Sequence, residues 1–145
     1  MWSHSILNDS FTDPTDPNYV TRFNTTVGIP KDRINASLAL TYDKVFFSYQ
    51  MRYISKQLIG DYETVNAVDG RAATNPNQYP DNYYPNVDYH DFRLGLNFST
   101  RSNFYVGVDN AFDRRPPYGS TGIGGGTGIF DNIGRRFYAG ITANF

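Results

Sequence analysis

The chain has 145 residues, with 13 basic and 14 acidic side chains and a formal net charge of −1. This near balance excludes the basic footprint of a nucleic-acid-binding protein, and the absence of cysteine excludes a disulfide framework or a thiolate metal site. No run of about 18 apolar residues occurs, so a transmembrane helix is not predicted. The negative mean hydropathy of −0.52 still allows a membrane β-barrel, in which only alternate strand residues face lipid.

Five segments alternate apolar and polar residues with a period of two, which predicts strands with one apolar and one polar face. They are residues 33–42, 45–55, 91–99, 103–109 and 136–145. Glycine lies on the polar faces, where it suits the close packing of a plug or sharp curvature. The apolar faces include Leu38, Phe47, Leu96, Val106 and Ile141, and the polar-face glycines are Gly95, Gly107 and Gly140.

The connections between these strands alternate between short and long. The short ones are Asp43-Lys44 and residues 100–102, and the long ones are residues 56–90 and 110–135, with a further long polar segment at 8–31. Up-and-down membrane barrels have short periplasmic turns and long extracellular loops. Unstructured loops of this length are uncommon in compact soluble domains. The pattern therefore favours a membrane barrel wall whose last strand runs towards the periplasm.

Three stretches near the C-terminus resemble TonB-dependent outer-membrane receptors. Residues 106–117 contain Asn110-Ala111-Phe112-Asp113, similar to the end of that family's penultimate strand. Gly134-Arg135 precedes aromatic residues, as at the start of the family's last strand. The chain ends in Phe145, with apolar residues at every second position upstream. Weaker similarities occur at residues 28–35 and 89–93, so the resemblance covers about residues 28–145.

The resemblance implies an all-β fold: an antiparallel up-and-down transmembrane β-barrel segment, cut from a plugged barrel of about 22 strands. The whole chain, residues 1–145, would be the C-terminal part of such a barrel, with five strands and a stub of a sixth at residues 2–7. The family's plug and its TonB-contacting segment are not expected among these 145 residues. The expected location is the outer membrane of a Gram-negative bacterium, in contact with lipid and with the rest of the barrel and its plug.

The resemblance also implies that the last strand carries a signal for barrel assembly. Its alternating apolar residues and terminal phenylalanine are similar to the signal that the barrel-assembly machinery reads. The residues concerned are Phe137, Ala139, Ile141, Ala143 and Phe145.

Candidate ligand contacts lie in the long segment 56–90. Tyrosine and arginine suit recognition of ferric siderophores or sugars, and the segment offers Tyr62, Arg71, Tyr79, Tyr83 and Tyr84. An ordinary solvated loop is the competing interpretation. His90, beside Asp88 and Asp91, is interpreted as a polar residue at the outer rim rather than as a metal ligand. The glycine-rich stretch 119–128 is not followed by the Lys-Ser/Thr pair of a phosphate loop. It is interpreted as a flexible loop.

Polar-face arginines and strand-end aromatics complete the candidates. Arg33, Arg52 and Arg93 are expected to line the lumen, paired either with plug carboxylates or with neighbours such as Asp91. Aromatic residues near strand ends are predicted to form interfacial girdles: Tyr42, Phe46, Phe47, Tyr53, Tyr89, Phe104 and Phe137. No catalytic constellation and no cofactor site are predicted.

Two functional hypotheses follow, together with a third possibility. The first is transport: a barrel segment of a receptor for a scarce ligand such as a ferric siderophore, a corrinoid or an oligosaccharide. The second is a small soluble β-sheet binding domain, which would bury its apolar faces in one core, whereas a barrel wall would leave them on one continuous outer surface. Residues 1–7 do not read as an export signal, so a truncated, non-functional remnant is the third possibility.

Overall fold

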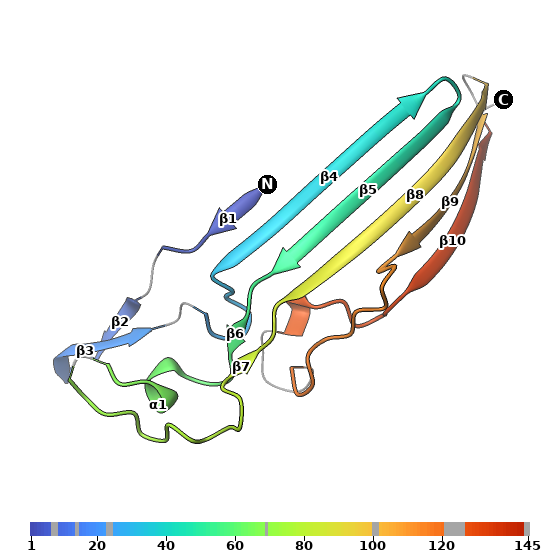
Figure 1. The fold of residues 1–145 in the computed structure, drawn as a ribbon. Helices are drawn as coiled ribbons and strands as arrows, with labels where there is room; N and C mark the ends of the chain where they lie inside the picture. The colour runs from blue at the N-terminus through green and yellow to red at the C-terminus, as the bar shows by residue number, and fades with distance from the viewer. Residues whose placement is uncertain are drawn as a thin grey trace.

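The computed structural model describes residues 1–6, 9–13, 15–22, 25–68, 70–99, 102–120 and 127–143. Its main element is one antiparallel sheet of six strands (Figure 1), in the order β1-β4-β5-β8-β9-β10. Their bounds are β1 (Trp2–His4), β4 (Asp32–Tyr42), β5 (Val45–Ile54), β8 (Val87–Ser99), β9 (Ser102–Asp109) and β10 (Arg136–Ala143). The all-β, up-and-down antiparallel fold is confirmed, and the sixth strand is β1.

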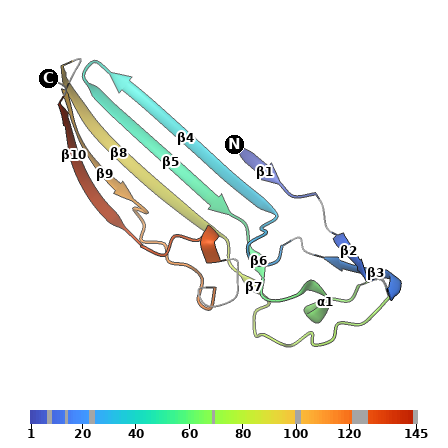
Figure 2. The ribbon, with the colours of Figure 1, turned by 180° about the vertical axis from the view of Figure 1, so that it is seen from behind.

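The sheet is curved and twisted rather than flat (Figures 1 and 2), as expected for a segment of a barrel wall. Among the described strands, β1 pairs only with β4 and β10 pairs only with β9, so the sheet has two edges and does not close.

Long and short connections lie at opposite ends of this sheet (Figure 1). The long ones hold the small elements: the hairpin of β2 (Asp9–Asp13) and β3 (Asp16–Arg22), the pair β6 (Gln57–Leu58) and β7 (Tyr83–Tyr84), helix α1 (Tyr62–Val65) and a 3-10 turn at Thr127–Ile129. At the other end, Asp43 takes a positive φ of 49° in the two-residue turn between β4 and β5. The predicted sorting of the connections is confirmed.

Two boundaries differ from the sequence prediction. Residues 8–31 were expected to be a loop, but they contain the β2–β3 hairpin. Strand β8 begins at Val87 and not at residue 91. The cause is a change of phase, because Val87 and Tyr89 are apolar residues on the otherwise polar face, where both are buried. At residues 87–90 the apolar side chains therefore lie on the inner face, whereas at residues 91–99 they lie on the outer face.

The buried core is small and lies at the loop end of the sheet. Ile54, Val87, Tyr89 and Phe130 form one buried cluster, with Ile129 packed against it. The Tyr89 hydroxyl accepts a hydrogen bond from the Asp131 amide at 3.0 Å, and the Arg52 guanidinium lies 4.7 Å from the Tyr89 ring centre. This cluster packs Ile129 and Phe130 against the inner face of β5 and β8.

The apolar face of the sheet, in contrast, is not covered by any described part of the chain. Leu38 is 48% exposed, Val106 is 43% exposed and Ile141 is 73% exposed. Leu96 is also exposed and Phe47 is half-buried. These are the residues that a soluble domain would have to bury together. They form instead the continuous outer surface that was expected of a barrel wall.

The predicted aromatic girdle needs one correction. Phe46 and Tyr89 lie on the polar, inner face, because their positions in β5 and β8 have the parity of Ser48 and Asp91. Neither ring therefore belongs to an outer girdle. Tyr42, Phe47, Tyr53, Phe104 and Phe137 have the parity of the outer face.

Each inner-face glycine lies directly opposite an aromatic residue of the neighbouring strand. The pairs are Gly95 with Phe46, Gly107 with Tyr138, and Gly140 with Tyr105. A Cβ atom on any of these glycines would lie far inside van der Waals contact with the opposing ring. The rings thus cover the glycines, an arrangement that fixes the register of a curved sheet.

Replacing Gly107 with alanine should therefore destabilise the sheet by about 1–3 kcal/mol, because the new methyl group overlaps the Tyr138 ring. In the Tyr138→Ala background the same change should cost much less, since the ring is gone. Thermal unfolding of the four proteins of this cycle measures the coupling. Additive losses would contradict the proposed packing.

Candidate functional site

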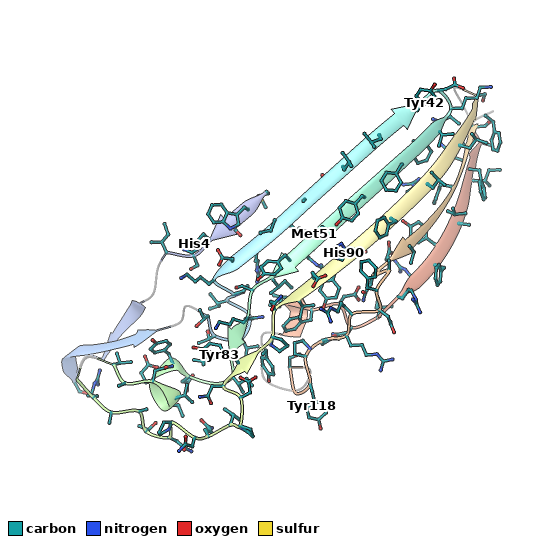
Figure 3. The ribbon with its side chains drawn as sticks, viewed as in Figure 1. His4, Tyr42, Met51, Tyr83, His90 and Tyr118 are labelled. Atoms are coloured by element: carbon teal, nitrogen blue, oxygen red, sulfur yellow. The ribbon has the colours of Figure 1, made fainter. Side chains whose placement is uncertain are left out.

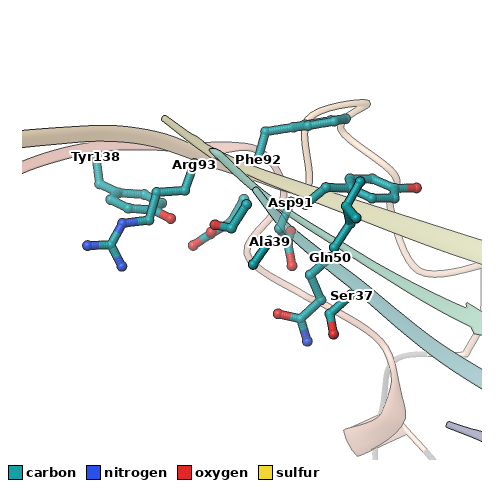
Figure 4. A pocket seen from close by; sticks show the side chains of 11 residues that line it. Ser37, Ala39, Gln50, Asp91, Phe92, Arg93 and Tyr138 are labelled. Atoms are coloured by element: carbon teal, nitrogen blue, oxygen red, sulfur yellow. The ribbon is translucent and has the colours of Figure 1, made fainter. Parts of the chain in front are cut away.

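The inner face carries a hollow of about 280 Å³ that extends from β4 to β10 and is lined by both polar and apolar groups (Figure 4). Its polar lining comes from successive inward positions of neighbouring strands: Ser37, Ser48, Gln50, Asp91, Arg93, Asp109 and Tyr138. Ser37 pairs with Gln50 and Gln50 pairs with Asp91, so these three residues lie side by side across β4, β5 and β8. This surface could offer hydrogen bonds to a polar ligand or to a polar protein surface.

The three predicted inner-face arginines have partners within the chain. Arg93 lies between aromatic rings, 3.8 Å from the centre of Tyr105 and 5.5 Å from that of Phe46. Arg52 lies over the ring of Tyr89, and Arg33 donates to the Gly28 carbonyl at 3.0 Å.

Asp91, the carboxylate considered as a partner for these arginines, binds elsewhere. Its side chain accepts a hydrogen bond from the Asn110 amide at 2.7 Å. Among the described residues none of the three arginines forms an ion pair with it. Arg136 instead bridges to Asp109 at 2.6 Å. Pairing with a plug remains a prediction.

The Asn-Ala-Phe-Asp motif forms a tight clasp at the loop end of β9. Asn110 is fully buried and has a positive φ of 49°. Its side chain accepts from the Arg114 amide and donates to the Arg114 carbonyl, both at 2.8 Å. Asp113 then accepts from the Arg135 amide at 3.0 Å, so the clasp of residues 110–114 ties β9 to the start of β10.

This clasp is the part of the site to which no role was assigned from the sequence. The motif was recognised there as a family pattern, and its asparagine is the available signal. Asparagine tolerates a left-handed backbone and hydrogen-bonds to nearby main chain, so it suits a turn that must both reverse and close on itself.

His90 lies near the loop end of β8 (Figure 3), on the outer face. One ring nitrogen lies 2.8 Å from the Tyr49 hydroxyl and the other lies 2.8 Å from Asp88. Arg114 approaches the same Asp88 carboxylate at 3.5 Å, and the Phe112 ring packs edge-on against His90 at 5.0 Å. The described residues contain no group of three His, Cys, Asp or Glu side chains that could hold a metal ion.

The five candidate ligand contacts are dispersed over the long connection between β5 and β8. Tyr62 is in α1, and Arg71 forms an isolated backbone β-bridge with Val68. Tyr79 lies further along the loop. Tyr83 and Tyr84 form β7, and the Lys56 ammonium lies 4.6 Å from the Tyr83 ring centre. Their role in ligand contact stays a prediction.

Tyr84 has a clear structural role within this group. Its side chain is buried, and its hydroxyl donates to the Gly119 carbonyl at 2.9 Å. Burial raises the pKa of the Tyr84 phenol above its ordinary value, which by itself already keeps the hydroxyl protonated at neutral pH. Tyr84 thus joins the loop 56–86 to the loop 110–120.

The predicted assembly segment is exposed on the outer face of β10. Phe137, Ala139, Ile141 and Ala143 share that face and are all exposed, while Phe145 lies outside the described residues. In the described part of the chain, no helix is both long and apolar enough to cross a membrane.

Two substitutions of Asn110 separate the contribution of its side-chain hydrogen bonds from that of its positive φ. Asn110→Ala should lower the free energy of unfolding by about 2–4 kcal/mol, because it loses both hydrogen bonds and places alanine at a positive φ. Asn110→Gly keeps the backbone conformation and should cost less. Denaturant unfolding of both variants, with the exposed Asn132→Ala as control, tests this order. Equal losses for alanine and glycine would contradict it.

Comparison with known proteins finds similarity in structure alone. No family model and no curated protein sequence matches the chain. Among solved structures, a mutant of the ferric enterobactin receptor from Pseudomonas aeruginosa matches with a TM-score of 0.51 and 18% sequence identity. The match covers 87% of this chain and 17% of the receptor chain. The fold of this chain is thus similar to that of a short part of this receptor.

Proposed function

We propose that this chain is the C-terminal wall segment of a TonB-dependent outer-membrane receptor that takes up a scarce ligand. A ferric siderophore is the favoured class of ligand, and corrinoids and oligosaccharides are the alternatives. The observation that carries the proposal is the continuous exposed apolar face, with Leu38, Val106 and Ile141 between 43% and 73% exposed. The structural similarity to part of a ferric enterobactin receptor supports the same assignment.

The dimensions of the strands support a membrane-spanning role. A tilted strand needs about 9–11 residues to cross the hydrocarbon layer, and β4, β5 and β8 have 11, 10 and 13 residues. The long connections at one end and the two-residue turn at the other fit the extracellular and periplasmic sides of such a barrel. In this orientation the ligand would meet the loop end first.

The open edges support a chain that works as part of a larger assembly. In the described sheet, the outer edges of β1 and β10 present unpaired backbone groups, which are costly in hydrocarbon. We expect the rest of the receptor barrel to pair with both edges and its plug to contact the inner polar face. TonB would act through that plug, and the barrel-assembly machinery would recognise β10.

A soluble sandwich is disfavoured by the same apolar face. A sandwich buries one face of each sheet against a second layer, and no described element covers the outer face of β4, β5, β8, β9 and β10. The described core is confined to the loop end.

Leu96→Arg should block insertion into the outer membrane, because it places a charge on the lipid-facing side at a cost of up to about 2–4 kcal/mol. Asn97→Arg is the matched control, since its side chain points to the inner face and the same charge there stays in contact with water. Outer-membrane fractionation of the complete gene product measures both. Normal insertion of the Leu96 variant would contradict the lipid-facing assignment.

The size of the native product tests whether the chain belongs to a receptor. An antibody against residues 110–145 should detect, in the outer-membrane fraction, a heat-modifiable band several times larger than the 16.4 kDa of this chain. A band of 16.4 kDa in the soluble fraction, or none, would favour a truncated remnant or a soluble β protein instead.

A further inference from the structure

A second hollow lies on the inner face, at the loop end of the sheet. Its volume is about 240 Å³. The first residues of β4, the last residues of β5 and the 3-10 turn of the loop 110–135 line it. The lining includes Arg33, Asn35 and Arg52 from the strands and Gly128 and Ile129 from the turn. These five residues define what we call the arginine hollow.

The register of the sheet brings the two arginines to one place. Asn35 of β4 pairs with Arg52 of β5, and Arg33 pairs with Ile54, two residues further along β5. Arg33 and Arg52 are therefore diagonal neighbours on the inner face, with Asn35 next to both. Long side chains at such diagonal positions are within reach of one another, and both arginines line the same hollow.

Each arginine has a contact that holds its side chain without neutralising its charge. Arg33 donates a hydrogen bond to the Gly28 carbonyl at 3.0 Å. The Arg52 guanidinium lies 4.7 Å from the centre of the Tyr89 ring. A guanidinium has five N–H donors, so these contacts leave donors on both side chains for a further partner. Arg33 is half-buried and Arg52 is exposed.

The carboxylates of this region are engaged elsewhere. Among the described residues, no acidic side chain lines the arginine hollow and no ion pair involves either arginine. Asp32 has the parity of the outer face and lies against His4 at 2.6 Å. Asp131 accepts a hydrogen bond from the Ile133 amide at 2.9 Å, and Asp91 accepts one from a backbone amide. Two positive charges thus share one hollow without a counter-charge.

This arrangement suits a carboxylate. Each planar guanidinium can donate two parallel hydrogen bonds to a carboxylate, and these charge-assisted bonds are stronger than neutral ones. The side-chain amide of Asn35 offers further donors beside the two arginines. Pockets that enclose a whole drug-sized ligand measure about 300–1,000 Å³. The arginine hollow is smaller, so it fits one acidic arm of a larger ligand.

We propose that the arginine hollow binds a carboxylate of the transported ligand, which is therefore an acidic, carboxylate-bearing compound. The hollow lies at the end of the sheet that carries the long connections, which is the cell exterior in the proposed orientation. An incoming ligand would thus reach it near the entrance to the barrel. This inference rests on the proposed function and names the chemistry of its ligand. Neutral oligosaccharides are disfavoured by it, because they would leave both charges uncompensated.

The test measures binding of tricarballylate, a small tricarboxylate, to the complete gene product in detergent at low ionic strength. Isothermal titration calorimetry should detect binding of tricarballylate and none of its neutral triamide. Arg33→Gln and Arg52→Gln should each weaken binding by about tenfold or more, because each removes a charged fork. Lys31→Gln should leave binding unchanged, since this exposed lysine precedes β4 at the same end of the sheet but lies outside the hollow.

A second pair of variants tests the charge while keeping both arginines. Asn35→Asp places a carboxylate beside the two guanidiniums, where it would take the place of the ligand's carboxylate. Tricarballylate binding should then be lost, although the protein stays folded by circular dichroism. Asn132→Asp adds the same charge at an exposed position of the loop 110–135 outside the hollow and should leave binding unchanged.

Three results would overturn the proposed carboxylate site. The first is no tricarballylate binding by the unmodified protein, as expected if a carboxylate of the plug already fills the hollow. The second is equal affinity for the triamide, and the third is unchanged binding in the Asn35→Asp variant. None of them bears on the receptor assignment, which is contradicted instead if the unmodified protein is absent from the outer membrane.

Discussion

The alternation of side chains between the two faces of β4, β5, β8, β9 and β10 is the constraint on which the rest of the structure depends. Neighbouring strands pair in a register that keeps apolar residues on one side and polar residues on the other. A shift of one residue would exchange the two faces of a strand. The glycine–aromatic pairs oppose such a shift, because Phe46, Tyr105 and Tyr138 each fit over a glycine of the adjacent strand. The register in turn aligns the side chains that line the hollow on the inner face.

The loop end is stabilised by interactions of a different kind. There the strands leave their regular alternation, Val87 and Tyr89 turn apolar side chains inward, and a small core forms with Phe130. Buried Asn110 closes the clasp, and Tyr84 links two loops through the Gly119 carbonyl. The described parts of the long connections are therefore held to the end of the sheet, and loops fixed in this way can position binding residues with little loss of order on binding.

Most of the regular structure could be predicted from the sequence, because period-two alternation specifies a strand and its faces. Residues 33–42, 45–55 and 103–109 correspond closely to β4, β5 and β9. The prediction was wrong where that pattern changes, at Val87–His90 and in the β2–β3 hairpin. The partners of Arg93 could not be predicted, since they depend on which residue of β9 lies beside it. The role of Asn110 could not be predicted either, because it depends on how the turn closes in three dimensions. The tyrosines of residues 62–84 stay predictions, because no ligand contact tests them.

Cysteine scanning of β8 tests the central claim, that one face of this sheet meets lipid, most directly. These 145 residues contain no cysteine, so single cysteines can be placed at positions 91–94 and 96–98 of the complete gene product, from which any cysteine elsewhere has been removed. Each variant is reconstituted in lipid and labelled separately. A lipid-facing wall predicts that a water-soluble thiol reagent reaches positions 91, 93 and 97, and that probes at 92, 94, 96 and 98 are quenched by lipid-borne quenchers. Uniform labelling by the water-soluble reagent, without quenching at the even positions, would contradict a lipid-facing wall.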